Sequence, residues 1–320
     1  MPNIHHPRRG SLQVWPRKRA KRSFPRMRTW PKENEIKLLA FVGYKAGMTH
    51  VIASDTSPHT MYKNEKIFIP VTIVECPPLK PLSLRFYKKS YNGLRLIAEL
   101  FSKVLDKDVK KYIKIPKKEI NVPEDFDEVR LRVYTQPKLL DFGKKKPETL
   151  EIGISGNGIK EKLEFGKGLL EKEIKLKDVL INEKLLDAHA VTKGKGFQGT
   201  VKRFGVKIRQ HKSEKTKRGI GSLGSWHPNK VQYSVAQAGR MGYHQRTEYN
   251  KFVLLLDSDA KKVNPKSGFL HYGFVKNDYV ILKGSIPGAT KRTIILTPAV
   301  RPLKRSPSIQ LTSINLDSKQ

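Results

Sequence analysis

Apolar residues in the first quarter of the chain recur in short blocks that are typical of β-strands. The blocks 38–42 and 48–52 flank Gly43 and Gly47, and this arrangement predicts a hairpin. Residues 67–74 form the longest apolar run and are rich in β-branched side chains, which predicts a buried strand. We therefore expect this part of the chain to be built from strands.

The same pattern resumes later in the chain. We expect strands in three apolar blocks: 252–256, 279–283 and 292–296. The block 292–296 is expected to pair with 279–283 across a turn at 284–288, which contains glycine and proline. Because strands distant in sequence can share a sheet, residues 33–79 and 182–300 are expected to close one discontinuous β-barrel. Residues 301–320, with four basic residues and one acidic residue, predict a tail.

Residues 80–181 are predicted to form a separate α+β insert. Asn92 precedes apolar residues at 94, 97, 98, 101 and 105, a spacing typical of a helix that begins there. Alternating apolar residues predict two strands, at 129–133 and 150–154. A helical stretch is expected after them, over 166–180. The insert has 24 basic and 16 acidic residues, so its charge is mixed and typical of a solvated surface.

Composition limits the class of protein. The chain has 320 residues, of which 38% are hydrophobic, enough for one large domain or two modest ones with a core. Its single cysteine, Cys76, excludes an internal disulfide and is typical of a reducing compartment. Residues 1–9 lack the apolar stretch of a signal peptide, and no apolar run approaches the ~18 residues of a membrane span. We expect a soluble, intracellular and strongly basic protein.

The charge is distributed very unevenly. The net charge is +35, and residues 1–32 contain ten Lys or Arg with no acidic residue. Residues 193–251 contain fourteen basic and two acidic residues, a net of +12, whereas residues 33–79 have a net of −1. Charge this dense repels itself in a compact fold and favours a polyanionic partner. The sequence predicts a near-neutral body with a basic N-terminal extension and a basic internal loop.

The polyanion is predicted to be nucleic acid rather than a membrane surface. Neither basic segment can form a long amphipathic helix, because the first contains five prolines and the second many glycines. Residues 1–32 are expected to be extended and ordered only by a partner. Their aromatic residues, Trp15, Phe24 and Trp30, either dock on the protein's own core or stack on unpaired bases.

Two glycine-rich motifs lie in the basic loop. Residues 191–199 read VTKGKGFQG, in which glycines let the backbone approach phosphates and lysines supply charge. A glycine-rich turn with solvated lysines is the other interpretation. Residues 219–224 match G-x-G-x-x-G, but neither a strand before them nor a helix after them is expected, so dinucleotide binding is not predicted.

No catalytic or metal-binding pattern is present in the sequence. The nine histidines lack metal-ligand spacing, G-x-S-x-G does not occur, and no carboxylates cluster in the basic loop. We expect no enzyme, cofactor, metal or small-molecule substrate. A DNA-binding module would need a recognition helix, which the basic segments rich in glycine and proline cannot supply. The alternative that remains open is an RNA-modifying enzyme, which would need a cofactor pocket with an acid or base within reach.

Three motifs in order, within 191–203, 218–228 and 238–248, resemble the universal large-subunit ribosomal proteins of the L-three family. The basic start and the FVGYKAGMT stretch at 41–49 agree with this family. The insert resembles its archaeal and eukaryotic branch rather than the bacterial one, and the length fits archaeal members best. One departure is Lys217, where eukaryotic relatives have a histidine, so a modification specific to that histidine is not carried over.

The resemblance implies a six-stranded barrel of the translation-protein type on the outer face of the subunit. A long loop and an N-terminal arm would thread into ribosomal RNA, and the loop tip, about 217–226, would approach the peptidyl-transferase centre. Family members are primary RNA binders that nucleate assembly near the 3′ end of the large rRNA. The implied partners are 23S-type rRNA and neighbouring large-subunit proteins, and the implied location is the cytoplasm, in the large ribosomal subunit. Besides the RNA-modifying enzyme, another RNA-binding protein outside the ribosome remains open as an alternative.

Charge, glycine content and resemblance together give one set of expected RNA contacts. They are Arg17, Lys18, Arg19, Lys21, Arg22, Lys193, Gly194, Lys195, Gly196, Phe197, Lys202, Arg203, Lys207, Arg209, Lys212, Lys215, Lys217, Arg218, Trp226, His227, Arg240, His244 and Arg246. Affinity is expected to come mainly from Lys and Arg on phosphates, and specificity from the shape of the folded RNA.

Overall fold

The computed structural model describes residues 10–58, 60–61, 63–116, 122–180, 182–303 and 308–317. The first nine residues of the expected N-terminal extension and parts of the expected tail lie outside these ranges. The chain divides into two compact units. We call Phe24–Ala190 with Thr247–Gln320 the sheet unit, and Met1–Ser23 with Val191–Arg246 the basic unit. In the described residues, no helix is long and apolar enough to cross a membrane.

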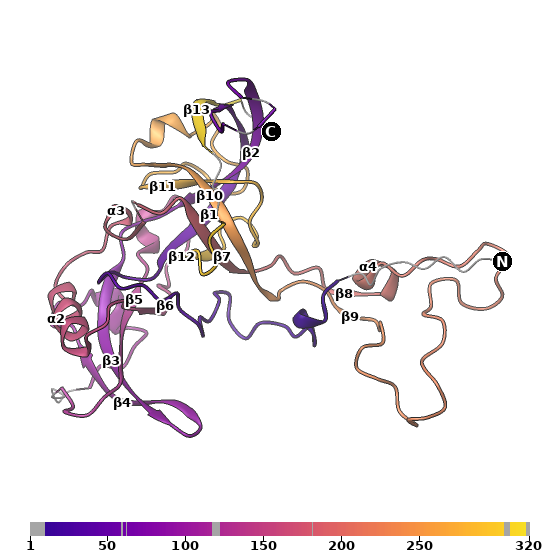
Figure 1. Ribbon diagram of the computed structural model, residues 1–320, viewed down its shortest axis with the longest axis horizontal. Helices are drawn as coiled ribbons and strands as arrows, with labels where there is room; N and C mark the ends of the chain where they lie inside the picture. Colours follow the sequence, from indigo (N-terminus) through magenta and orange to yellow (C-terminus); the bar gives the residue numbers. More distant parts are fainter. Residues whose placement is uncertain are drawn as a thin grey trace. The chain divides into compact units, whose positions relative to one another are not determined.

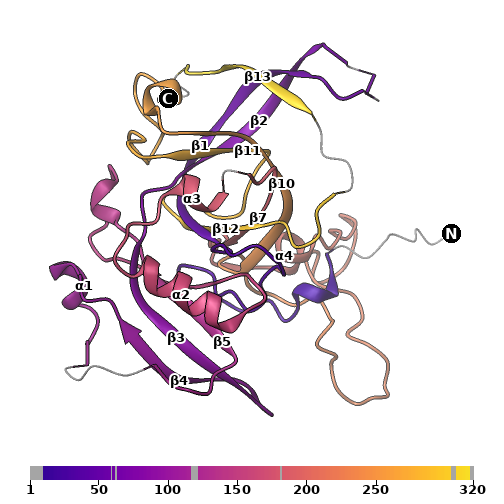
Figure 2. The ribbon, with the colours of Figure 1, turned by 60° about the vertical axis from the view of Figure 1, so that its left-hand side comes forward.

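The fold is mainly β, and its largest sheet has seven strands (Figure 1). These strands are β1 (Phe41–Asp55), β2 (Lys66–Glu75), β7 (Leu185–Val191), β10 (Gln245–Asp257), β11 (Tyr279–Lys283), β12 (Thr293–Pro298) and β13 (Ile309–Ile314). Their order is β12-β7-β10-β11-β2-β1-β13, and β12 also pairs with β1. Hydrogen-bonded pairing therefore passes through six strands and returns to β1, and Figure 2 shows these strands following a curve.

The hairpin expected over 38–52 is not formed, because most of this segment belongs to strand β1. It is one continuous antiparallel strand, with a register shift between Lys45 and Gly47 where it pairs with β2. The two glycines are explained by close neighbours rather than by a turn. A Cβ on Gly43 would lie 2.6 Å from Cγ1 of Val74, and one on Gly47 would lie 2.7 Å from the Phe269 ring. Both contacts come from distant parts of the sequence, so local pattern could not distinguish them from a turn.

Two further expectations about the later strands were wrong. Strand β12 does not pair back onto β11, because β10 and β2 occupy both edges of β11; β12 pairs with β7 and β1 instead. The segment expected to be a tail contributes β13, whose residues 309–314 pair with 51–55 of β1. The strands expected at 67–74 and 279–283 are confirmed as β2 and β11.

A second sheet of four strands, in the order β4-β3-β5-β6, forms most of the insert. Its elements are β3 (Lys80–Ser90), β4 (Gly93–Phe101), β5 (Glu128–Tyr134), β6 (Thr149–Gly153), α1 (Lys107–Lys110), α2 (Ile159–Leu169) and α3 (Leu176–Leu180). The strands expected at 129–133 and 150–154 are confirmed as β5 and β6. The structure also contains three short 3-10 helices: Leu12–Val14, Pro137–Leu139 and Ala260–Lys262.

The helix expected after Asn92 is a strand. Tyr91 and Asn92 form the turn of a hairpin that is closed by the pair Ser90 of β3 and Gly93 of β4, and Gly93 has φ +110°. Asn-Gly between two extended segments is a strong hairpin signal. The helical spacing arose by coincidence, because β4 also carries apolar residues on alternate positions.

The helical stretch expected over 166–180 is divided into two helices. Ile174 forms a β-bridge with Leu79, with backbone hydrogen bonds of 2.8 and 2.9 Å, and this pairing interrupts the helical pattern. Helix α2 begins earlier than expected and packs on the second sheet (Figure 2). Gly166 allows close packing there, since a Cβ at this position would lie 2.8 Å from Leu84.

One hydrophobic core spans both sheets of the sheet unit. It contains Val42 and Ile294 of the larger sheet together with Leu84 and Leu131 of the smaller one. Phe24, Met27 and Trp30 pack against this core, and the Trp30 ring lies against Gly153 of β6. Phe24 and Trp30 therefore dock on the protein itself rather than remaining free to stack on bases.

Glu75 is a fully buried carboxylate at the end of β2. Its Oε1 accepts hydrogen bonds from the backbone N–H groups of Lys276 and Asn277, at 2.9 and 3.0 Å, and from Asn277 Nδ2 at 2.7 Å. Its Oε2 accepts from the Tyr272 hydroxyl at 2.5 Å. Burial, with the carboxylate beside it, raises the pKa of Tyr272, so this hydroxyl stays a donor. The carboxylate fixes the loop before β11 to the sheet.

His189 predicts a loss of stability in mild acid. Its ring nitrogens lie 2.8 Å from the Thr247 hydroxyl and 3.1 Å from that of Thr297, and burial lowers its pKa to about 4 despite the opposing charge of Asp187. Between the ordinary pKa of about 6.5 and this value, the unfolded chain binds the proton and the folded chain does not. The contribution of His189 to the free energy of unfolding is therefore fully present above pH 6.5, and the free energy of unfolding is lower by roughly 2 kcal/mol at pH 5.

The measurement is urea unfolding of wild type and His189→Gln at pH 7 and pH 5. The glutamine does not titrate, so its stability should fall less between the two pH values. Equal pH dependence of the two proteins would contradict the assignment to His189.

Candidate nucleic-acid interface

The basic unit is built on two chain limbs that pair with each other (Figure 1). Its regular elements are β8 (Phe197–Gln198), β9 (Gly239–Arg240) and α4 (Thr200–Phe204). Backbone N–H groups of Thr192, Lys195 and Met241 donate across the limbs to His244, Met241 and Gly196, each at 2.9 Å. We call these paired limbs, 191–198 and 239–246, the stem.

Gly242 is required by the stem. It has φ +73°, and a Cβ built on it would lie 2.1 Å from the carbonyl oxygen of Lys193. Backbone in the left-handed region costs a residue with a side chain roughly 1–2 kcal/mol, and here a steric clash is added. The close pairing of the limbs therefore depends on the absence of a side chain at this position.

The N-terminal segment is attached to the stem by hydrogen bonds. The Ala20 N–H donates to the Tyr243 carbonyl at 2.8 Å, and Nδ1 of His244 lies 2.7 Å from the Lys18 carbonyl. Burial lowers the pKa of His244, partly offset by this hydrogen bond, so the ring is neutral and donates from Nδ1. His244 was expected to contact RNA, but it is buried and holds the N-terminal segment to the stem.

Trp15 packs on Phe204 of α4, with ring centroids 4.9 Å apart. The Arg17 guanidinium lies over the Phe204 ring at 4.2 Å and donates to the Arg203 carbonyl at 2.6 Å. Arg203 in turn donates to the carbonyls of Arg240 and Gln237, at 3.1 and 2.8 Å. Arg17 and Arg203 were both expected to contact RNA, and their hydrogen bonds also link segments of the basic unit to one another.

Most of the other expected contacts lie exposed. They are Lys18, Arg19, Lys21, Arg22, Lys193, Gly194, Lys195, Gly196, Phe197, Lys202, Lys207, Arg209, Lys212, Lys215, Lys217, Arg218, Trp226, His227 and Arg240, whereas Arg246 is half-buried and burial lowers its pKa. Of the residues that the structure describes, no Lys or Arg between 193 and 240 forms an ion pair. In the insert, by contrast, Arg85 and Arg132 both pair with Glu99. The positive charge of the basic unit is therefore left for a partner.

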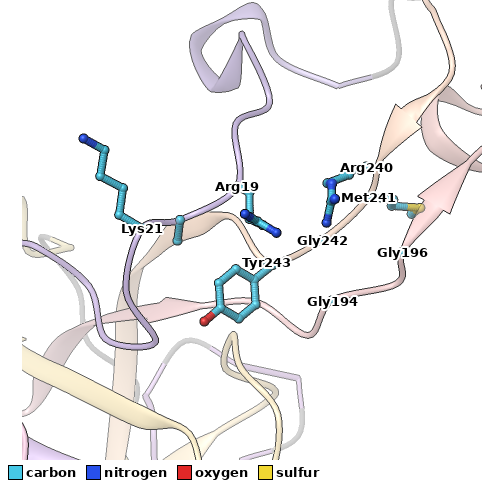
Figure 3. A pocket seen from close by; sticks show the side chains of 9 residues that line it. Arg19, Lys21, Gly194, Gly196, Arg240, Met241, Gly242 and Tyr243 are labelled. Carbon is cyan, nitrogen blue, oxygen red and sulfur yellow. The ribbon is translucent and has the colours of Figure 1, made fainter.

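A pocket of about 660 Å³ lies between the N-terminal segment and the stem. It is lined by Arg19, Ala20, Lys21, Gly194, Gly196, Arg240, Met241, Gly242 and Tyr243. Figure 3 shows the side chains of Arg19 and Arg240 coming together above Gly242, whereas the Lys21 side chain extends away. The pocket thus combines two converging guanidinium groups with glycine backbone, a combination suited to an anion.

Three aromatic side chains of the basic unit are strongly exposed. Trp226 is 80% exposed, Tyr233 75% and Phe197 74%. Large aromatic residues are usually buried, so exposed ones among cations indicate a stacking surface. Tyr233 is absent from the sequence-based expectations; its signal was an aromatic residue in a charged, glycine-rich stretch. Among the described residues, no group of acidic, histidine or cysteine side chains could hold a metal ion.

Replacing Gly242 by alanine is expected to weaken RNA binding roughly tenfold, because the added Cβ separates the limbs that carry the cations. The sheet unit should keep its melting temperature. Gly199→Ala is the matched control, since Gly199 has φ −70° and a Cβ there meets nothing within 4 Å. Filter binding to a large structured RNA measures both variants, and equal affinities would contradict the role of Gly242 in the stem.

The chain was compared with known proteins. The family model described as Ribosomal protein L3 matches residues 1–121 and 106–320. The chain is 44% identical over 330 residues to the large ribosomal subunit protein uL3 of Methanocaldococcus jannaschii, covering 99% of this chain and 98% of that protein. It is 43% identical to the protein of the same name from Methanosphaera stadtmanae and 41% identical to that from Methanobrevibacter smithii, at similar coverage.

Proposed function

This chain belongs to the ribosomal protein L3 family, and from this premise we propose that it is a structural constituent of the large ribosomal subunit. Its role is architectural rather than catalytic, and it acts in translation as part of the ribosome in the cytoplasm. The relatives' printed name, large ribosomal subunit protein, supports this assignment over nearly the whole chain.

We propose further that the basic unit is the rRNA-binding part. The observation that carries this proposal is the set of exposed Lys and Arg between 193 and 240 that form no ion pair among the described residues. A folded protein that leaves so many cations unpaired needs a polyanion to neutralise them. Phosphate contacts with counterion release would supply affinity, and the shape of the RNA would supply specificity.

The finer architecture belongs to the same proposal. The six strands whose pairing returns to β1 would form the discontinuous barrel of the translation-protein type. The sheet unit would lie on the outside of the subunit and contact neighbouring large-subunit proteins. The basic unit would bind near the 3′ end of 23S-type rRNA, nucleate assembly and reach toward the peptidyl-transferase centre.

Crosslinking in intact cells tests the proposed function. A tagged chain should sediment with the large subunit, and ultraviolet crosslinks should join residues of the basic unit to the large-subunit rRNA. Crosslinks should be far fewer from the insert, where arginines such as Arg85 are already paired with carboxylates. Sedimentation apart from the large subunit would overturn the assignment.

Trp226→Ala is expected to alter the function of the assembled ribosome without preventing assembly. The indole is 80% exposed, so its loss should not destabilise the protein, whereas stacking on a base is worth roughly 1–3 kcal/mol. We expect changed tRNA binding, or changed sensitivity to drugs that act at the peptidyl-transferase centre. Leu223→Ala, at a half-exposed apolar residue of the same loop, is the control. Wild-type behaviour in fully assembled Trp226→Ala ribosomes would contradict the stacking role.

A further inference from the structure

We infer that the pocket between the N-terminal segment and the stem binds one nucleotide of rRNA. Arg19 and Arg240 would grip its phosphate, and the Phe197 ring would stack on a base beside it. This inference rests on the proposed function, because the ligand is a nucleotide of the rRNA that the basic unit binds. It adds a defined site to a surface otherwise described only by its charge.

The two guanidinium groups indicate a single anion. Arg19 comes from the N-terminal segment and Arg240 from β9, and their side chains converge above Gly242 (Figure 3). Within the described residues, neither guanidinium has an ion-pair or hydrogen-bond partner. Two cations held together repel each other unless an anion lies between them, and guanidinium forks match phosphate oxygens in pairs.

The backbone beside these arginines is open to a ligand. Gly194 and Gly196 line the pocket, Gly196 has φ +70°, and a Cβ built on it meets nothing within 4 Å. Any side chain placed there would therefore project into free space next to the arginines. Glycine at both positions lets the main chain approach a phosphate without a Cβ between them.

Phe197 places an aromatic face next to the same pocket. It pairs with Arg240 across β8 and β9. Side chains directly opposite in an antiparallel pair project from the same face, with Cβ atoms roughly 5 Å apart. The ring is 74% exposed, so it contributes little to any core of the unit.

The combination favours RNA over an acidic peptide. A peptide carboxylate could bind the arginines, but it offers no flat face for the exposed ring beside them. A nucleotide supplies a phosphate and a base, and arginine with an aromatic ring is a common pair for unpaired RNA. The nucleotide must be unpaired, since a base within a helix could not stack on Phe197.

A double-mutant cycle on the full chain tests the shared phosphate. The probe is the full-length large-subunit rRNA of the source organism, bound at several salt concentrations. Arg19→Ala and Arg240→Ala should each weaken binding about tenfold and reduce the salt slope by about 1, and the double variant should lose little more than either alone. Arg240→Ala with Lys212→Ala is the control pair, whose effects should multiply. Multiplying effects of Arg19→Ala and Arg240→Ala would overturn the shared phosphate.

Variants of Phe197 test the stacked base. Phe197→Ala and Phe197→Leu should weaken binding roughly 5- to 150-fold with no change in salt slope, whereas Phe197→Trp should bind as wild type does. Because the ring is exposed, all three variants should melt at the wild-type temperature. Equal affinity of the leucine and phenylalanine proteins would exclude stacking.

Two measurements distinguish a nucleotide site from a free-phosphate site and from a failure of the proposed function. In the first, inorganic phosphate is added at constant ionic strength, and protection of the pocket from arginine-modifying reagents is measured. If phosphate protects the pocket while Arg19→Ala and Arg240→Ala bind rRNA normally, the pocket is a free-phosphate site and the inference fails. If wild type itself binds rRNA weakly and with a shallow salt slope, the proposed function fails. Tight wild-type binding that none of the pocket variants changes would overturn the nucleotide site alone.

Discussion

Binding of the free protein to large-subunit rRNA should weaken by on the order of 10⁴- to 10⁵-fold when monovalent salt rises from 50 to 200 mM. Each phosphate neutralised contributes roughly −0.7 to −0.9 to the slope of log K against log salt, because bound counterions are released. The chain carries a net charge of +35. If ten exposed cations contact phosphates, the slope is about −7 to −9. Filter binding at five or more salt concentrations measures it.

The location of the effective cations can be tested in the same assay. Neutralising Lys207 and Lys212 together should reduce the slope by about 2. The control is Lys177→Ala with Lys167→Ala on the insert, which removes the same charge from a part of the chain with mixed charge. A wild-type slope shallower than about −3 would contradict the charge argument, and equal slope changes from the two pairs would contradict its assignment to the basic unit.

Glu75→Ala should destabilise the sheet unit by roughly 3–5 kcal/mol. The substitution removes the acceptor of the buried Tyr272 hydroxyl and of three part-buried donors, which are two backbone N–H groups and the Asn277 amide. Each buried donor left without a partner costs about 1–3 kcal/mol, and partial relaxation keeps the total below the simple sum. Thermal unfolding should show the melting temperature of the sheet unit lower by on the order of 10 °C.

Glu75→Gln is the matched control. A glutamine keeps a carbonyl oxygen for the three nitrogen donors, and its amide can donate to the Tyr272 oxygen in place of the original bond. We expect it to cost much less than the alanine substitution. If both variants melt together, the negative charge of Glu75 rather than its hydrogen bonding holds the loop to the sheet.

The strands that sequence predicted well are those whose pattern is set by local burial. Residues 71–74 and 279–282 are almost entirely apolar because both faces of β2 and β11 are covered there, whereas burial alternates in the first half of β2, where Phe68 and Pro70 are exposed. Residues 94–105 were misassigned, since apolar spacing fits a helix and a strand equally, and only the Asn-Gly signal at the hairpin turn, where Ser90 pairs with Gly93, decided between them. The glycines of β1 could not be interpreted locally because Val74 and Phe269 explain them.

The uneven charge of the sequence predicted where the candidate interface lies, but it did not predict which of its arginines bond to the protein itself. Sequence cannot distinguish an arginine that donates hydrogen bonds to the protein's own carbonyls from one that has no partner in the protein, because the same guanidinium group can do either. Arg17 and Arg203 donate to backbone carbonyls, whereas Arg19 and Arg240 have no such partner among the described residues. Only the folding of the N-terminal segment onto the stem brings Arg19 and Arg240 together.

Strand β1 also determines when the sheet can be finished during synthesis. It is made before the insert and the basic unit, yet two of its partners, β12 and β13, follow them both in the chain. Until those strands emerge, an edge of β1 stays unpaired, and such an edge is prone to pair with other chains. The basic unit, by contrast, is complete once residue 246 has been made. A nascent chain can therefore present its cations to RNA before its largest sheet has closed, and early RNA contact would protect it while that edge is open.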